Sequence, residues 1–89
     1  MTKDAKDTIQ FPCFFPIKAI GKNTADFEPH VVAIIRQHVP ELGDDKISRR
    51  MSADDKYLSV TATFTAQSRE QLDALYRALS SDKQVMMIL

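Results

Sequence analysis

The chain offers few residues whose type and spacing suit a metal ion. His30 and His38 are eight residues apart on one expected helix, too far to hold a single ion from adjacent turns. Cys13 has no histidine or second cysteine at ligand spacing. The pairs Asp44-Asp45 and Asp54-Asp55 fall in expected turns, where aspartate is favoured, and they lack the alternating oxygen ligands of a calcium loop. We predict no metal and no cofactor, and we expect His38 to pack against or cap its helix end.

The hydroxyl and acidic residues predict no catalytic site either. Ser68, with Gln71 three residues later, forms the pattern of a capping box at the start of a helix. Glu70 and Asp73 then fall on the solvent side of that helix. An enzyme needs a nucleophile, a base and an orienting group that converge in a pocket. The pattern therefore favours a protein that is not an enzyme.

One turn has the features of an anion-binding site. Gly21, Lys22, Asn23 and Thr24 connect an expected strand to the start of an expected helix. The free N–H groups and the dipole of a helix N-terminus favour an anion or a carboxylate. We predict a small anionic ligand here; the alternative is an ordinary glycine-ended strand followed by a capped helix.

Apolar residues near the C-terminus form a second candidate site. If the last strand lies beside the first, Ile20, Met86 and Ile88 adjoin on the sheet face that no helix covers. Exposed apolar residues clustered on a sheet are typical of a partner surface, and the last strand is also a free edge. We predict a homodimer through these residues; the alternative is an incidental patch.

RNA binding is a further possibility for a sheet of this kind, because RNA-recognition sheets stack bases on aromatic residues of their two central strands. Only Tyr57 places a ring on the expected open face. Lys46, Arg49 and Arg50 make a basic stretch, but aspartates flank it on both sides. A solvated edge strand is the preferred interpretation, and no nucleic-acid partner is predicted.

The composition sets the class of protein. Lysine plus arginine number 12 and aspartate plus glutamate number 12 in 89 residues, so no net field attracts nucleic acid or an anionic membrane. No apolar run approaches the roughly 18–20 residues that span a bilayer, and the N-terminus lacks the apolar stretch of a signal peptide. The single cysteine suits a reducing compartment. We expect a cytoplasmic protein with a disordered tail over residues 1–10 and one domain over residues 11–89.

The clearest structural pattern lies in residues 57–66, where apolar and polar side chains alternate over ten positions. Such alternation predicts a strand with one buried face. The apolar positions are Leu58, Val60, Ala62, Phe64 and Ala66.

The remaining elements follow from similar patterns. We expect strands over residues 17–20, 46–53 and 85–89, with regular pairing of the first only from about Pro16, and helices over residues 27–38 and 69–79. Phe15, Ile17 and Ala19 should face the core. The order βαββαβ predicts a ferredoxin-like α+β sandwich, with both helices on one face of a four-stranded antiparallel sheet.

With these elements placed, residues 11–89 resemble the YbeD-like family of small bacterial proteins. The match rests on scattered positions of both halves: Phe11-Pro12, Lys18, Gly21, Val31-Val32, His38, Pro40, Tyr57, Ser59-Val60, Ala66, Leu75-Tyr76, Val85, Met87 and Leu89. The family is similar to ACT regulatory domains, which bind amino acids where the first strand enters the first helix, at a dimer interface. Gly21 corresponds to their glycine turn. The family's association with lipoate-synthesis genes implies a link to that pathway.

Together these observations predict a dimeric, non-enzymatic regulatory domain that binds a small anionic ligand. A ligand-independent protein–protein interaction module is the alternative from a different class, and an RNA-binding domain is the third.

Overall fold

The computed structural model describes residues 10–89, so residues 1–9 of the predicted tail lie outside the described part of the chain. The elements, in chain order, are β1 (Cys13–Lys22), α1 (Phe27–His38), β2 (Ile47–Met51), β3 (Tyr57–Ala66), α2 (Arg69–Ser80) and β4 (Met87–Ile88), with one 3-10 turn over Asp44–Lys46 before β2.

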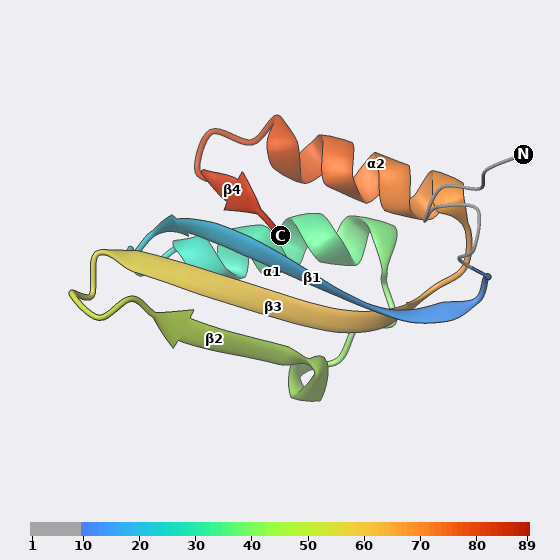
Figure 1. Ribbon diagram of the computed structural model, residues 1–89, viewed down its shortest axis with the longest axis horizontal. Helices are drawn as coiled ribbons and strands as arrows, with labels where there is room; N and C mark the ends of the chain where they lie inside the picture. Colours follow the sequence, from blue (N-terminus) through green and yellow to red (C-terminus); the bar gives the residue numbers. More distant parts are fainter. Residues whose placement is uncertain (1–9) are drawn as a thin grey trace, which may run out of the picture.

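The strands form one antiparallel sheet in the order β2-β3-β1-β4. The longest ladder joins the two central strands, from Cys13 opposite Ala66 to Lys22 opposite Tyr57. Figure 1 shows both helices on the same side of this sheet. The ferredoxin-like prediction is therefore confirmed.

The core lies between the sheet and the helices. The alternating apolar residues of β3 all face it and are at most 5% exposed, as the sequence pattern predicted. Ile17 and Ala19 of β1 are buried beside them, and the ring of Phe15 packs edge-on against Tyr76 of α2 at a centroid distance of 6.5 Å. Ser68 accepts a hydrogen bond from the N–H of Gln71, which confirms the predicted cap of α2.

The first strand is longer than predicted. Pairing starts at Cys13 rather than near Pro16, which lies opposite Thr63 within the ladder. The N–H of Lys18 points to β4, where it bonds Leu89, so the missing N–H of Pro16, two residues earlier, points to the same side. Because β4 does not extend that far, no ladder bond is lost there, and proline is tolerated at such an edge.

The last strand has a different register from the one predicted. Ile88 pairs with buried Ala19 and packs against the core, so its expected place on the open face is wrong. Met87 pairs with Ile20, and the N–H of Met86 also bonds the carbonyl of Ile20. Two residues thus lie opposite one, as in a β-bulge, which breaks the simple alternation of faces.

Candidate functional site

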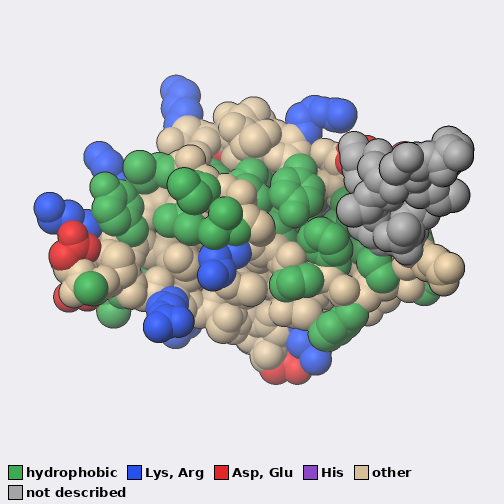
Figure 2. Space-filling model, in the orientation of Figure 1, with side chains coloured by type: hydrophobic (Ala, Val, Ile, Leu, Met, Phe, Trp, Pro, Cys, Tyr) green, Lys and Arg blue, Asp and Glu red, His purple; other side chains and the backbone are tan. Residues whose placement is uncertain are grey.

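The uncovered face of the sheet is polar at its centre and apolar toward one end. The register places on this face Phe14, Pro16, Lys18, Ile20 and Lys22 of β1, Ser48 and Arg50 of β2, and Tyr57, Ser59, Thr61, Thr63 and Thr65 of β3. Met87 joins them from β4. Figure 2 shows this side of the molecule, with hydrophobic side chains gathered over and beside β4.

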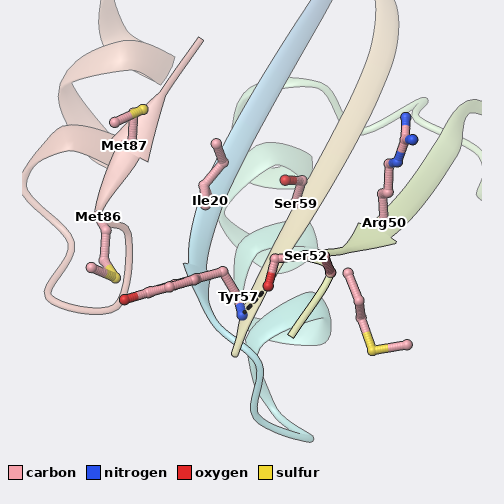
Figure 3. Close-up of a pocket in the computed structure, with 9 residues that line it drawn as sticks. Ile20, Arg50, Ser52, Tyr57, Ser59, Met86 and Met87 are labelled. Carbon is pink, nitrogen blue, oxygen red and sulfur yellow. Dashed lines mark hydrogen bonds between the residues drawn. The ribbon is translucent and has the colours of Figure 1, made fainter. Parts of the chain in front are cut away.

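A groove of about 700 Å³ opens on this face near β4 and the β2–β3 hairpin. Its apolar lining includes Ile20, Tyr57, Met86 and Met87. Figure 3 shows the ring of Tyr57 extending from the start of β3 toward Met86, so it bridges the central strands and β4. Met86, Met87 and Tyr57 are exposed by 57%, 54% and 41%, respectively. We call this site the sheet groove.

Polar residues line the side of the sheet groove that faces β2. Arg50, Ser52 and Ser59 are the polar side chains there. The hydroxyl of Ser52 accepts a hydrogen bond from the N–H of Tyr57 at 3.1 Å and donates to Asp54 at 2.7 Å. The Ser52 bond to Asp54 lowers the pKa of that carboxyl, and a bond from the Lys56 N–H adds to the effect. The hairpin end is therefore held in place by its own polar contacts.

Of the two sites predicted from the sequence, the apolar one keeps two of its three residues on the open face. Ile20 and Met86 do lie together in the sheet groove, with Met87 in the place expected for Ile88. Whether these residues form an interface stays a prediction.

At the predicted anion site, Gly21 is needed for space. A Cβ at this position would lie 2.3 Å from the ring of Phe27 and 2.4 Å from the carbonyl oxygen of Gln84. Its φ is not in the positive region, so close approach of α1 and of the segment before β4 is the reason for glycine.

Two backbone donors of the same turn, those of Asn23 and Thr24, are already used. The N–H of Asn23 bonds the carbonyl of Lys56, and the N–H of Thr24 bonds that of Lys22, both at 2.9 Å. The Asn23 side chain also donates to the Asp55 carbonyl at 3.0 Å. Asn23 therefore ties the turn to the β2–β3 hairpin.

Negative charge already occupies the start of α1. The hydroxyl of Thr24 donates to the Asp26 carboxylate at 2.7 Å, which lowers the pKa of Asp26. Glu28 follows in the first turn, and Pro29 has no N–H to offer. A ligand anion would have to use lysine side chains instead: Lys22 and Lys83 both line a depression of about 320 Å³ beside the turn.

Sequence reasoning missed two features. Phe14 is 66% exposed on the open face, with the Lys46 ammonium 5.7 Å from its ring centroid, because pairing was expected to begin after it. His30 Nε2 lies 2.7 Å from a carboxylate oxygen of Asp82. The two residues are 52 positions apart, so no local sequence pattern predicts this contact.

Within residues 10–89 no three histidine, cysteine, aspartate or glutamate residues lie close enough together to hold a metal ion. None of the helices in that part of the chain is long and apolar enough to span a membrane.

Comparison with known proteins gives a family match over nearly the whole chain. Residues 6–89 match the family described as "Protein of unknown function (DUF493)". The chain is similar to the UPF0250 protein NE1487 of Nitrosomonas europaea, with 42% identity over 81 residues that cover 91% of this chain and 93% of the relative. It is also similar to a UPF0250 protein of Paraburkholderia phytofirmans, with 37% identity over the full length of both. The resemblance to small bacterial proteins predicted from the sequence is confirmed.

Solved structures share the fold. The solution structure of protein HP0495 from H. pylori matches with a TM-score of 0.70 at 17% identity and covers 100% of this chain and 94% of its own. The ACT domain from GTP pyrophosphokinase of Chlorobium tepidum matches with a TM-score of 0.53 at 14% identity, over 85% of this chain and 94% of its own. The fold is therefore ACT-like.

Proposed function

Because the chain belongs to the DUF493 family and has an ACT-like fold, we propose that it is a non-enzymatic regulatory domain that acts by binding another protein chain. The sheet groove is the proposed contact site. The supporting observation is an apolar surface, built by Ile20, Tyr57, Met86 and Met87, that no described part of the chain covers. Exposed apolar clusters on a sheet are typical of interaction sites, and methionine side chains adapt to the shape of a partner.

The test compares the protein with a variant whose groove is shortened. Met86→Ala combined with Met87→Ala removes two exposed side chains and leaves the buried core unchanged. Affinity capture from the source cell, followed by mass spectrometry, should recover a partner with the unmodified protein and lose it with the variant. Capture of the same proteins by both would refute the groove as the contact site.

A homodimer is a separate proposal, supported by the outer edge of β4. Both backbone groups of Leu89 bond Lys18, so the N–H and carbonyl of the preceding Ile88 point away from β1, where a second copy could pair. Sedimentation velocity should show a dimer, and the Ile88 amide should exchange more slowly as the protein concentration rises. A monomer mass at every concentration would rule the homodimer out.

A small anionic ligand is the second candidate function, and the pair Lys22 and Lys83 beside the predicted turn favours it. The resemblance to a family associated with lipoate-synthesis genes suggests which compounds to test. Thermal unfolding should be followed with amino acids, lipoyl compounds and octanoyl compounds. A stabilising shift that Lys22→Ala abolishes, and that the control Arg77→Ala on α2 keeps, would support this function; no shift with any compound would count against it.

A further inference from the structure

The sheet contains no carboxylate side chain. All ten aspartate and glutamate residues within residues 10–89 lie outside the strands. The strands do contain cations: Lys18, Lys22, Arg49 and Arg50. A molecule with a formal net charge of zero therefore has an open sheet face on which the strands place only positively charged side chains: Lys18, Lys22 and Arg50.

The two adjacent arginines of β2 differ in their surroundings. Arg49 lies on the helix side of the sheet, opposite buried Val60. It pairs with Glu28 of α1, with Nη2 at 3.0 Å from one carboxylate oxygen. This contact with Glu28 raises the pKa of Arg49 further above its ordinary value. Arg50, one residue on, lies opposite Ser59 and lines the sheet groove.

The cations of the open face form no ion pair in the described structure. Three ion pairs form within residues 10–89, and Lys18, Lys22 and Arg50 belong to none of them. The carboxylates closest to the groove along the chain are Asp54 and Asp55, in the hairpin turn. Asp54 accepts bonds from Ser52 and from the Lys56 N–H, and these bonds hold its carboxylate in the turn.

Building on the function proposed above, we infer that the sheet groove binds a segment of a different protein that carries carboxylates next to apolar side chains. The apolar side chains would enter between Tyr57, Met86 and Met87, and the carboxylates would lie against Arg50 and Lys18. Charge complementarity of this kind selects the correct partner and speeds its association.

A second copy of the chain fits this face poorly. In a two-fold interface the same patch meets itself, so Lys18 and Arg50 would meet the same cations of the other copy with no carboxylate on either face. Like charges placed across an interface oppose association. The homodimer proposed above uses the β4 edge and leaves this face free.

Nucleic acid also fits poorly, although it is an anion. The two rings on the open face, Phe14 and Tyr57, stand at opposite ends of the central ladder. Eight register steps separate them, about 27 Å along the strands, whereas base stacking by a sheet uses rings that lie close together on its central strands. The apolar lining of the groove suits side chains better than phosphates.

The experiment uses a displayed library of random dodecapeptides as the probe, selected on the full-length protein. Enriched peptides should combine aspartate or glutamate with large apolar residues. A synthetic copy of one such peptide, followed by fluorescence anisotropy, should bind Arg50→Glu about tenfold more weakly than the parent. Arg77→Glu, an exposed cation on α2, is the matched control and should change the affinity less than twofold.

Each other result decides against the inference. The inference is wrong if no peptide is enriched, if the enriched peptides lack carboxylates, or if the peptide binds Arg50→Glu as well as the parent. It is also wrong if a single-stranded oligonucleotide binds the parent more tightly than the peptide does and Arg50→Glu abolishes that binding.

The Met86→Ala, Met87→Ala variant separates the proposed function from the inference about partner chemistry. If it loses peptides that Arg50→Glu still binds, the groove is a contact site and only the partner chemistry is wrong. If it binds every peptide as the parent does, the proposed function fails as well.

Discussion

At the scale of single residues, the two glycines show how one residue type serves different needs. Gly21 admits the Phe27 ring and the Gln84 carbonyl into the space of a missing side chain. Gly43 has an extended backbone with φ −92° and ψ 162°, and a Cβ there would approach only the exposed Asp45 side chain, at 2.7 Å. Only the first position has rigid neighbours.

We therefore expect Gly21→Ala to destabilise the protein by about 1–3 kcal/mol, because a ring and a backbone carbonyl must both move. Gly43→Ala should cost less than about 1 kcal/mol, since the Asp45 side chain can rotate away and alanine lowers the entropy of the unfolded chain. Urea unfolding of both variants measures the difference. Equal costs would show that the packing around Gly21 is not the reason for glycine.

Asp82 joins three parts of the chain through one side chain and one carbonyl. One carboxylate oxygen meets His30 Nε2 of α1 at 2.7 Å, and the other accepts the Gln84 N–H at 2.8 Å. Its carbonyl accepts the Val85 N–H at 3.3 Å. Burial acts to raise the pKa of Asp82, but the bonds from Gln84 and His30 outweigh it and the pKa falls below the ordinary 3.8.

This lowered pKa predicts how acid affects stability. The folded pKa of Asp82 lies below its unfolded value, so its contribution is fully present above the unfolded pKa of about 3.9 and is lost as the pH falls through the folded pKa. The stability gap between the protein and Asp82→Asn should therefore be larger at about pH 6 than at about pH 2. Urea unfolding at both values measures it; a gap independent of pH would contradict this role.

At the scale of elements, β4 depends on its neighbours for its register. Its ladder has only two residue pairs, and the flanking bonds from Met86 to Ile20 and from Leu89 to Lys18 extend it. The bulge at Met86 and Met87 turns both methionines to the sheet groove and leaves Ile88 on the core side. One extra residue opposite Ile20 thus decides which side chains a partner meets.

The register makes a direct prediction for two adjacent residues. Ile88→Ala should cost about 1–2 kcal/mol, below the range for a fully buried isoleucine because Ile88 is only partly buried. Met87→Ala should cost less than about 0.5 kcal/mol, as expected for an exposed side chain. Thermal or urea unfolding of the two variants compares them. A larger loss from Met87→Ala would mean that the faces are reversed.

At the scale of the whole molecule, stability should be greatest along the ladder between β1 and β3. This ladder joins ten residue pairs at the centre of the sheet, whereas β2 and β4 are edges with five and two pairs. The helices cover only one face, so the core is a single layer between sheet and helices (Figure 1).

Native-state hydrogen exchange should reproduce this order. The amides of Ile17, Ala19, Val60 and Ala62 should exchange only with global unfolding, and those of β4 should exchange through local opening of much lower free energy. Exchange measured across increasing urea separates the two. Global protection of the β4 amides in a monomeric sample would show that the edge is more stable than its short ladder indicates.

Much of this arrangement was predictable because it depends on local patterns. The alternation from Leu58 to Ala66 predicted a strand and its buried face, and Ser68 with Gln71 predicted where α2 begins. The sheet groove was only partly predictable. Ile20 and Met86 were expected there, but parity counted along β4 assigned Ile88 to the wrong face, because a bulge leaves no mark in a sequence of apolar residues.

By itself, the sequence determined the order of the elements and the side of each long strand that faces the core, since periodicity and capping act within a few residues. Only the tertiary structure decided that β4 is short and bulged, that Phe14 joins the open face, and that Asp82 meets His30. It also decided that Lys18 and Arg50 share the open face, while Arg49 lies on the helix side beside Glu28. These features arise where segments far apart in the chain meet. There the neighbouring segment, rather than the local residue pattern, sets the register of a strand and decides which charged side chains lie together.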